Sequence, residues 1–439
     1  MNVAIIGAGW AGLAAAIAAT QAGHQTTVFE AARTVGGRAR ALTIPSTDAP
    51  PLVLDNGQHI LIGAYTTSLR LMRLVGVDVD AALLRLPLVL RFPGGNGLQL
   101  PDLPPPWDAL LGIARARGWS WRDRIALLRT AHTWQRAGFV CAPQDTVATL
   151  CAHLPQGLLG GFIDPLCVAA LNTPAHAASG QVFLRVLQDS LFSGRGGSNL
   201  LLPRVDLGTL FPEAATAWLT GQGAMVRTGE RVLALTPPAP GQGWLVDGTP
   251  FDAVVLATSS TEAARLVSHS AQTAPYSMTV PLCDWAASAQ ALRFRAITTV
   301  YAQGTPPAQG HLLPEPMLAL HSSAEHPAQF VFDRGQLGGP PGLLAFVASD
   351  SQGERTQTEQ QVLQQARAQL GLPDLQVVQT VVEKRATFAC TPDLQRPGAC
   401  IAPGLQACGD YIAGPYPATL EGAVRSGWEA AQALATPDT

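Results

Sequence analysis

The first thirty residues restrict the fold of this chain more than any other segment. Residues 3–6 (VAII) are apolar and β-prone, and a glycine-rich turn follows them directly. Its glycines have the spacing G-x-G-x-x-G: Gly7, Gly9 and Gly12. An alanine-rich helix is expected next, and then a second strand that finishes at Glu30. A glycine turn between strand and helix, with an acid about 20 residues later, predicts a Rossmann-type α/β domain that binds a dinucleotide.

Each part of this motif has a physical role in holding a dinucleotide. The first glycine permits the tight turn, the second lets a diphosphate approach the backbone, and the third lets helix and strand pack closely. The helix begins around Ala11 and Gly12, and its free N–H groups attract the diphosphate. The carboxylate of Glu30 can accept hydrogen bonds from ribose hydroxyls. The alternative is a glycine-rich start to an unrelated α/β domain.

Composition narrows the class of protein. The chain has 439 residues, enough for two domains; 47% are apolar and only 13% charged. A disordered chain has the opposite balance, and a net charge of −3 gives no basic field for nucleic acid. Seven cysteines without a C-x-x-C pair indicate neither a disulfide framework nor a zinc site, so we expect no metal and a cytoplasmic location. No uninterrupted apolar run reaches the roughly 18 residues of a membrane span.

A second glycine motif distinguishes between cofactors. The sequence GGR stands six residues after Glu30, and an arginine fork suits a phosphate. The two motifs together resemble the FAD-containing amine oxidase and carotenoid desaturase superfamily, in which E-x5-G-G-R follows the first glycine turn. The resemblance implies FAD as the cofactor, with Gly36, Gly37 and Arg38 near its diphosphate. Plain nicotinamide dehydrogenases do not carry the second motif.

Further segments follow in the order that this superfamily uses. LDNGQHILIG (54–63) resembles the segment beside the flavin ring, which implies cofactor contacts from three residues: Gly57, Gln58 and His59. GAMVRTGERVLAL (223–235) resembles the strand whose backbone meets the adenine, at Val232. FDAVVLAT (251–258) resembles the strand that closes the cofactor domain.

The segment GDYIAGPYPATLEGAVRSG (409–427) completes the cofactor frame. The resemblance implies that Asp410 holds the ribityl chain. It also implies a helix that starts near Thr419 and Leu420 and directs its N–H groups at the flavin pyrimidine edge. A helix N-terminus there would stabilise the negative charge of the reduced flavin.

The cofactor motifs occupy three separated segments, 1–75, 208–275 and 383–439, which are expected to form the FAD-binding domain. The two intervening segments, 76–207 and 276–382, are expected to pair into a mixed α+β substrate domain. Both domains are therefore expected to be discontinuous in sequence.

Two departures from the superfamily pattern count against amine oxidation. Amine oxidases of this superfamily usually have a lysine near flavin N5, on a strand that ends in V-Y. The corresponding strand, AITTVY (296–301), has none, and the only lysine of the chain, Lys384, lies elsewhere in the sequence. Thr419 stands where these enzymes tend to have an aromatic residue.

Several longer stretches resemble the hydroxysqualene dehydroxylases, squalene-associated FAD enzymes of bacterial hopanoid pathways. They extend over almost the whole chain: LDNGQHILIGAY (54–65), PLCVAALNTPAHAASGQVFLRVLQDSL (165–191), FVFDRG (330–335), EKRATFACTP (383–392) and GPYPATLEGAVRSG (414–427). The resemblance implies that hydroxysqualene, a thirty-carbon allylic alcohol, is reduced to squalene. Reduced flavin N5 would give a hydride to the allylic cation that remains when the protonated hydroxyl departs.

This chemistry needs a proton donor near the leaving oxygen and a source of electrons. His59, beside the ring, and Tyr416, in the loop before the last helix, are the candidate catalytic donors. Only one strand–G-x-G-x-x-G–helix unit is found, since the glycines of SGRGGSN (193–199) have no strand and acid around them. A separate electron donor, either a flavin reductase or exchanging reduced flavin, is therefore expected.

Alternative functions stay open. An oxidative polyene desaturase shares the cofactor frame and the apolar substrate, a flavin amine oxidase shares the frame, and a prenyl-lipid carrier could keep it without catalysis. Residues 107–136 combine four tryptophans with six arginines and only two acids. This segment is either a pair of substrate-domain helices with a solvated arginine face or a peripheral contact with the inner face of the cytoplasmic membrane.

Overall fold

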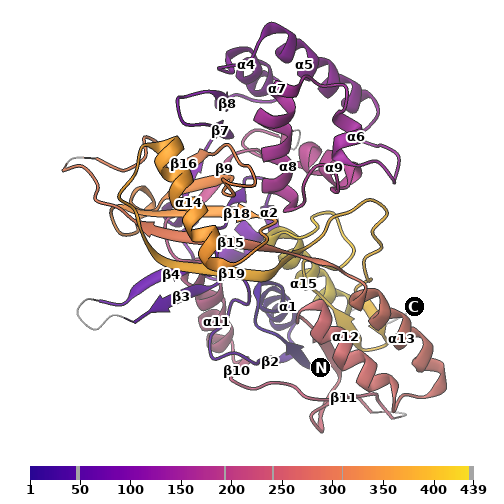
Figure 1. Ribbon diagram of the computed structural model, residues 1–439. Coiled ribbons are helices and arrows are strands. Elements are labelled where there is room, and N and C mark those ends of the chain that lie inside the picture. The colour runs from indigo at the N-terminus through magenta and orange to yellow at the C-terminus, as the bar shows by residue number, and fades with distance from the viewer. Residues whose placement is uncertain (46–49, 192–193, 240–241, 309, 435–439) are drawn as a thin grey trace.

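Six strands form a sheet around the N-terminal motif (Figure 1). The computed structural model describes residues 1–45, 50–191, 194–239, 242–308 and 310–434. In spatial order the strands are β10 (Met225–Thr228), β2 (Gln25–Glu30), β1 (Asn2–Ile6), β14 (Ala253–Leu256), β21 (Leu405–Ala407) and β20 (Cys400–Ala402). All pairs are parallel except β20 with β21. The parallel sheet of the predicted Rossmann-type domain is therefore present, and its strand β1 is buried, as its apolar sequence predicts.

Both faces of this sheet are covered. One face packs on helices: α1 (Trp10–Gln21), α2 (Thr66–Leu74), α3 (Val79–Ala82), α10 (Leu207–Leu210), α11 (Pro212–Gly221) and α15 (Leu420–Leu434). The other face packs on a small sheet and two helices: β11 (Leu235–Thr236), β12 (Trp244–Val246), β13 (Thr249–Phe251), α12 (Ser260–Ala271) and α13 (Tyr276–Gln290). Alternate residues of β1 serve the two faces, Val3 and Ile5 on one side and Ala4 and Ile6 on the other.

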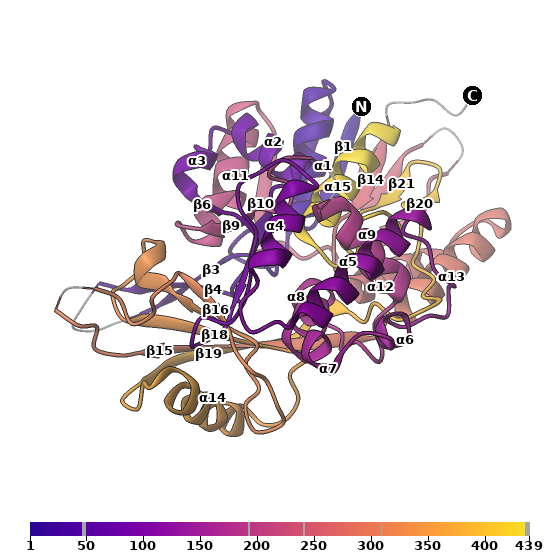
Figure 2. The ribbon, with the colours of Figure 1, turned by 90° about the horizontal axis from the view of Figure 1, so that it is seen from above.

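A second, antiparallel sheet lies beside the first. Its strands in order are β16 (Met317–Ala319), β17 (Phe330–Asp333), β18 (Leu343–Ser349), β15 (Phe294–Gln303) and β19 (Gln376–Phe388). Helix α14 (Arg355–Leu370) covers one face (Figure 2), where Val300 and Ala302 of β15 join its apolar cluster. Because side chains alternate along a strand, Thr299 and Tyr301 point to the opposite face. There the Tyr301 hydroxyl donates to the carbonyl of Asp55 at 2.9 Å.

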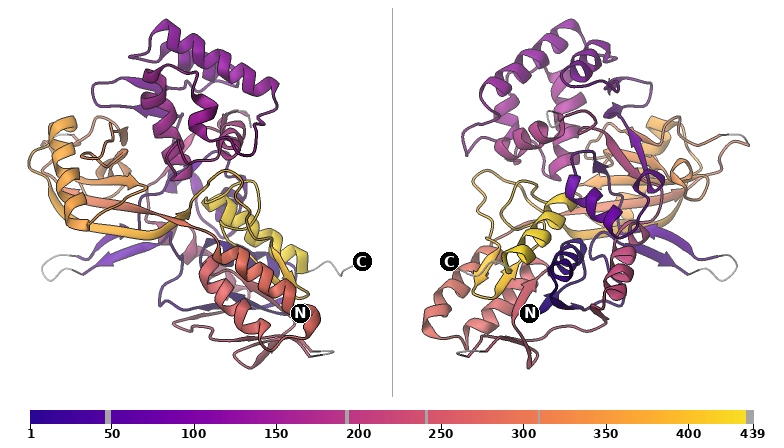
Figure 3. Two further views of the ribbon diagram at one scale, coloured as in Figure 1. Left: turned by 45° about the vertical axis from the view of Figure 1, so that its right-hand side comes forward. Right: turned by 180° about the vertical axis from the view of Figure 1, so that it is seen from behind.

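Short strands and a helical layer complete the chain. The strands are β3 (Ala41–Ile44), β4 (Leu52–Asp55), β5 (Leu61–Ile62), β6 (Leu83–Leu86), β7 (Val89–Arg91), β8 (Gly97–Gln99) and β9 (Leu200–Pro203). The helices are α4 (Trp107–Arg115), α5 (Trp121–Arg136), α6 (Val147–Cys151), α7 (Gln156–Leu158), the π-helix η1 (Leu159–Ile163), α8 (Asp164–Leu171) and α9 (Gly180–Leu191), and the 3-10 turn η2 (Arg334–Leu337) follows β17. The helical layer stands at the far end of the molecule from the six-stranded sheet (Figure 3).

The division into two domains stays a prediction. Helix α13 falls in the segment expected to belong to the substrate domain, yet it packs on α12 and β20. The indole N–H of Trp285 in α13 donates to the carbonyl of Gly398 at 2.8 Å, just before β20. The last predicted segment also includes residues 435–439, which lie outside the described part of the chain.

Candidate functional site

The glycine turn after β1 is tightly packed except at its middle glycine. Gly7 has φ +112°, and a Cβ there would lie 2.6 Å from the carbonyl oxygen of Ala257. A Cβ on Gly12 would lie 1.9 Å from the carbonyl oxygen of Gly7, so the first and third glycines are needed for packing. A Cβ on Gly9 would meet nothing closer than Gly37 Cα, at 3.8 Å. Helix α1 begins directly after Gly9 without a side-chain cap or an acid in its first turn, which suits an anion.

The second glycine motif lies directly beside the first. Gly9 and Gly36 form a parallel bridge, and the N–H of Gly36 donates to the carbonyl of Ala8 at 2.8 Å. Gly36 and Gly37 have φ of +103° and +62°, a region that glycine adopts without strain. Two motifs that are separate in sequence therefore meet at the N-terminus of α1, as a diphosphate site requires. The glycine cradle fits a dinucleotide.

Arg38 joins this cradle to two distant segments. Its Nη1 donates to the carbonyl of Ala386 in β19, and its Nη2 forms an ion pair with Asp410, which is buried. A guanidinium carries five N–H donors, so these contacts leave donors for a phosphate. The side chain of Asn56 donates to the carbonyl of Arg38 at 3.1 Å, which ties the cradle to the segment at residues 54–63.

Glu30 ends β2, as predicted, and its carboxylate faces the glycine turn. Its Oε2 accepts the N–H of Ala8 and its Oε1 accepts the N–H of Ala32, each at 2.8 Å. Each carboxylate oxygen can accept a second hydrogen bond, so a ribose hydroxyl still has acceptors here.

Val232 does not lie on a strand, which corrects the expectation of one strand over 223–235. Strand β10 ends at Thr228 and β11 begins at Leu235. The physical reason is Gly229, whose φ of +76° is incompatible with a strand. Val232 is buried, and its carbonyl accepts a hydrogen bond from Arg265 at 3.3 Å.

Helix α15 begins at Leu420, as predicted. The Thr419 hydroxyl accepts the N–H of Gly422 at 3.0 Å and so caps the helix. The fully buried carboxylate of Glu421 accepts the N–H groups of Thr67 and Ser68, both at 2.9 Å. The start of α15 is therefore fixed against the start of α2.

The segment expected beside the flavin ring is tightly turned. Gly57 has φ +118°, and Nδ1 of His59 lies 3.0 Å from the carbonyl oxygen of Gly57. Burial, aided by the positive charge of Arg38, lowers the pKa of His59 below its usual value. His59 is therefore neutral at pH 7, with Nδ1 donating to Gly57 and Nε2 left as an acceptor.

A buried ion pair behind this segment was missed by the sequence analysis. Asp55, 2% exposed, lies 3.6 Å from the guanidinium of Arg334 and accepts the N–H of Leu207 at 2.8 Å. Arg334 also donates to the side-chain oxygen of Gln58 at 3.3 Å, so it orients a predicted site residue. Burial raises the pKa of Asp55 to about 6, against the opposing charge of Arg334. The stretch FVFDRG contained the signal, because a charged pair follows three apolar strand residues.

Thr299 is a second residue that the sequence analysis did not single out. It is fully buried on β15, and its hydroxyl has no hydrogen-bond partner among the described residues. A Cβ placed on Gly57 would lie 3.8 Å from Thr299 Oγ1 and 3.9 Å from His59 Cε1, so the three residues border one small space. An unpartnered buried hydroxyl is unfavourable, and it fits a site that a polar group of a ligand completes.

Tyr416 lies in different surroundings from His59. Its ring makes an edge contact with Tyr65, with ring centres 6.4 Å apart, and the guanidinium of Arg425 lies 5.3 Å from its centre. Burial raises the pKa of Tyr416, so the phenol keeps its proton at neutral pH. Among the residues described, no hydrogen bond or ring contact joins Tyr416 to His59.

Lys384 is brought nearer to β15 than its sequence position implies. It lies on β19, which pairs with β15, and its neighbour Glu383 is opposite Ile297. The carboxylate of Glu383 accepts from Asn56 at 3.4 Å, whereas Lys384 is exposed. Lys384 lies where the pairing of β15 with β19 shifts register, so its exposure, and not strand alternation, shows that its side chain is open to solvent.

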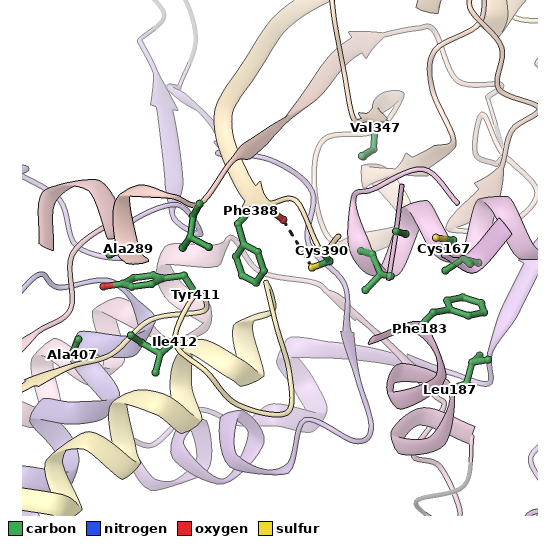
Figure 4. Packing of buried hydrophobic residues seen from close by; sticks show 14 of the residues in the cluster. Cys167, Phe183, Leu187, Ala289, Val347, Phe388, Cys390, Ala407, Tyr411 and Ile412 are labelled. Carbon is green, nitrogen blue, oxygen red and sulfur yellow. Dashed lines mark hydrogen bonds between the residues drawn. The ribbon is translucent and has the colours of Figure 1, made fainter. Parts of the chain in front are cut away.

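Two of the long sequence stretches meet beside this site. Figure 4 shows Cys167, Phe183 and Leu187 of the first stretch and Phe388 and Cys390 of the second within one buried apolar cluster. The N–H of Ser179 donates to the carbonyl of Cys390 at 2.7 Å. The side chain of Asn172 donates to Thr387 at 2.9 Å and accepts the N–H of Asp350 at 2.7 Å. The stretches thus connect the helical layer to the second sheet.

Two curated relatives are similar to the chain from end to end. A protein named hydroxysqualene dehydroxylase from Rhodopseudomonas palustris is 28% identical, over 98% of this chain and 97% of its own length. One of the same name from Sinorhizobium fredii is 26% identical, over 100% and 99%. A shorter match, 41% identical over 76 residues, is to a probable zeta-carotene desaturase from Synechococcus elongatus, and it spans 17% of this chain and 15% of that one.

The fold is shared with solved structures. An oxidoreductase from Methanosarcina mazei superposes with a TM-score of 0.71, at 17% identity, over 98% of this chain and all of that one. The family described as flavin containing amine oxidoreductase matches residues 10–435, which include every predicted cofactor motif except the first strand and the start of the glycine turn. The chain belongs to this family and is a flavin-dependent oxidoreductase with FAD as its cofactor.

Proposed function

We propose that the protein reduces hydroxysqualene to squalene. The observation that carries this proposal is the end-to-end similarity to two proteins named hydroxysqualene dehydroxylase. The stretches that resemble hydroxysqualene dehydroxylases also contact one another, which supports the proposal: Arg334 donates a hydrogen bond to Gln58, and Asn172 donates one to Thr387. Reduced FAD, when bound, would supply a hydride, which carries both electrons of the reduction and takes the place of the hydroxyl on carbon.

The chain's own residues would hold the cofactor along the glycine cradle. We assign the diphosphate to the start of α1 and the second glycine motif: Gly7, Gly9, Ala11, Gly12, Gly36, Gly37 and Arg38. Glu30 would accept from the ribose and Asp410 from the ribityl chain. The backbone at Val232 would meet the adenine. The ring would lie among the segment with Gly57, Gln58 and His59 and the start of α15 at Thr419 and Leu420.

The reaction requires that the allylic C–O bond breaks and that the oxygen leaves with its electron pair and an added proton, as water. His59 and Tyr416 are the residues to test as the proton's source. A neutral His59 must first take up a proton, so a role as the acid predicts activity that falls as pH rises. Tyr416 carries its proton throughout the neutral range but is a weak acid. We assign to Thr299 a hydrogen bond to the substrate oxygen, because its buried hydroxyl has no partner among the described residues.

Electrons would come from a separate donor, a flavin reductase or reduced flavin that exchanges in. The described part of SGRGGSN, residues 194–199, forms a turn before β9 and not a second strand–helix unit. Rapid reduction of the bound flavin by NADPH alone would contradict a separate donor. A thirty-carbon alcohol dissolves in lipid, so we expect the protein to meet this substrate at the inner face of the cytoplasmic membrane.

The first experiment is a single turnover without oxygen. The FAD-loaded protein is reduced with dithionite, mixed with hydroxysqualene, and followed by the flavin absorption spectrum and by extraction of the products. We expect the oxidised flavin spectrum to return in step with squalene. The matched control omits only the alcohol and should stay reduced. A flavin that stays reduced in the presence of hydroxysqualene sinks the proposal.

An oxidative polyene desaturase is the second candidate, and the short match to a carotene desaturase favours it specifically. It predicts the reverse electron flow: a less unsaturated polyene such as phytoene would reduce, and so bleach, the oxidised flavin while gaining a double bond. Peroxide release on adding polyamines would instead indicate an amine oxidase, which the exposed position of Lys384 disfavours.

A further inference from the structure

The outer faces of α4 and α5 expose large apolar side chains that nothing in the described chain covers. Trp107 is 61% and Trp121 71% exposed, and three aliphatic residues are also exposed: Leu110, Ile125 and, four residues after the end of α5, Val140. We call these five residues the α4–α5 surface. The two helices lie at the outer end of the helical layer, far from the candidate FAD site (Figures 1 and 3). Clustered exposed apolar side chains mark an interaction site more often than scattered ones do.

The exposed residues form a stripe opposite the buried face of each helix. In α5, Trp121 and Ile125 are four residues apart and therefore lie on one face, whereas the buried face carries Leu127, Thr130 and Trp134. In α4, Trp107 and Leu110 are three residues apart and lie on one face, whereas the buried Asp108 and Gly112 lie on the opposite face. Each helix therefore has two distinct faces: one packs on the protein, and the other, which is apolar, is exposed to solvent.

Positive charge flanks this stripe and no acid balances it. Five arginines of the segment are exposed and have no carboxylate within 4.0 Å among the described residues: Arg115, Arg117, Arg122, Arg129 and Arg136. Arg122, Arg129 and Arg136 are spaced seven residues apart, so they form one line along α5 beside the exposed apolar stripe. Neither acid of the segment neutralises these arginines, since Asp108 is buried and Asp123 forms a capping box with Ser120.

We propose that the α4–α5 surface binds the interface of an anionic lipid bilayer. Tryptophan rings favour the headgroup level, aliphatic residues favour the acyl boundary, and arginines pair with lipid phosphates, so each exposed residue type has its place there. No helix in the described part of the chain is long and apolar enough to cross a bilayer, which makes the contact peripheral. A protein partner would need an acidic surface with an apolar centre, and it is the rival outcome.

The test is flotation of the FAD-loaded full chain with two kinds of vesicle, phosphatidylcholine alone and phosphatidylcholine mixed with phosphatidylglycerol. We expect binding to the anionic vesicles and a loss of about five-fold in the partition coefficient for each arginine neutralised in Arg122→Gln/Arg129→Gln. Trp107→Ser/Trp121→Ser should reduce binding by at least as much. Both variants should keep the wild-type flavin spectrum, since the surface lies away from the site.

Matched controls remove the same residue types elsewhere. Tyr276→Ser/Val280→Ser removes an exposed aromatic and an exposed aliphatic side chain from α13, and Arg33→Gln/Arg73→Gln removes two exposed arginines. These variants should bind like the wild type. Absence of binding to anionic vesicles, equal binding to both vesicle types, or equal loss in the controls overturns the proposal. Stable binding to a second protein in place of vesicles, lost only in the α4–α5 variants, also overturns it and assigns the surface to that protein.

Discussion

At the scale of single residues, Thr299 allows stability and catalysis to be separated. Thr299→Val keeps the shape of the side chain and removes a buried hydroxyl that has no partner among the described residues. Without ligand, the valine variant should be as stable as the wild type or more so, because the desolvation cost disappears. In the proposed reaction its kcat should fall by about 10- to 100-fold, since the substrate oxygen loses a hydrogen bond.

Two measurements check this prediction, the midpoint of thermal unfolding without substrate and the single-turnover rate. Thr299→Ser is the control, because it keeps the hydroxyl and should keep most of the rate. A valine variant with the wild-type rate would assign Thr299 to packing alone. If the wild type does not consume hydroxysqualene, the unfolding midpoint still tests whether the hydroxyl is unsatisfied.

Asp55 gives a prediction on pH dependence. Its raised pKa, about 6, means that between about pH 4 and 6 the folded protein holds a proton that the unfolded chain releases. The stability that this group contributes is therefore present below about pH 4 and is lost as pH rises through about 6. Asparagine does not titrate, so the free energy of unfolding of the wild type relative to Asp55→Asn should fall by about 1–3 kcal/mol over this range.

Urea unfolding of both proteins between about pH 4.5 and 7 measures this difference. The free energy of unfolding of the wild type, relative to that of Asp55→Asn, should fall steadily as pH rises. Loss of the ion pair with Arg334 in Asp55→Asn adds an offset, so only the change of this difference with pH tests the prediction. A difference that grows in the opposite direction, or that does not change with pH, would show that Arg334 keeps Asp55 ionised over the whole range.

At the scale of elements, the contact of α1 with α15 depends on one glycine. A Cβ on Gly427 would lie 2.0 Å from the carbonyl oxygen of Ala11, so Gly427→Ala must move one helix. We expect a net destabilisation of about 1–3 kcal/mol, despite the better helix propensity of alanine. FAD content should fall as well, because the N-termini of both helices border the candidate site.

Gly221→Ala is the matched control for this exchange. It lies at the end of α11, where an added Cβ would meet nothing within 4 Å. It should be neutral or stabilise by up to about 1 kcal/mol. Thermal unfolding and the flavin-to-protein absorbance ratio of the two variants check the prediction. Equal behaviour of the two would mean that α1 and α15 adjust without cost.

At the scale of the whole molecule, Asn172 holds the helical layer to the second sheet. It ends α8 with φ +45° and bonds both Thr387 and Asp350. Asn172→Gly keeps the backbone conformation and loses the side-chain bonds, which should cost about 1–3 kcal/mol. Asn172→Ala should cost about 1 kcal/mol more, because alanine disfavours a positive φ.

Hydrogen exchange distinguishes a local from a global effect of these variants. Faster exchange in both α8 and the end of β19 is expected, since the hydrogen bond joins them. Urea unfolding gives the free energies. A glycine variant as stable as the wild type would show that packing of the apolar cluster, rather than Asn172, holds these parts together.

The sequence alone was sufficient for features that depend on neighbouring residues. The strand before Gly7, the strand that ends at Glu30 and the start of α15 at Leu420 were all predicted, because glycine turns and caps act within a few residues. The single strand expected around Val232 was wrong, because Gly229 breaks the pairing there. The end-to-end order of the motifs was enough to identify the flavin family and the Rossmann-type FAD-binding domain.

Only the tertiary structure decided which distant side chains meet. Arg38 with Asp410, and Asp55 with Arg334, are separated by more than half the chain. The charged residues in FVFDRG single out Arg334, but no local pattern identifies the partner of either arginine. The direction of Thr299 depends on which face of the second sheet α14 covers. A strand fixes the alternation of its side chains, but packing decides which side of it becomes the interior. For that reason the sequence specified the cofactor frame, while the polar groups that surround the proposed substrate became visible only in the folded protein.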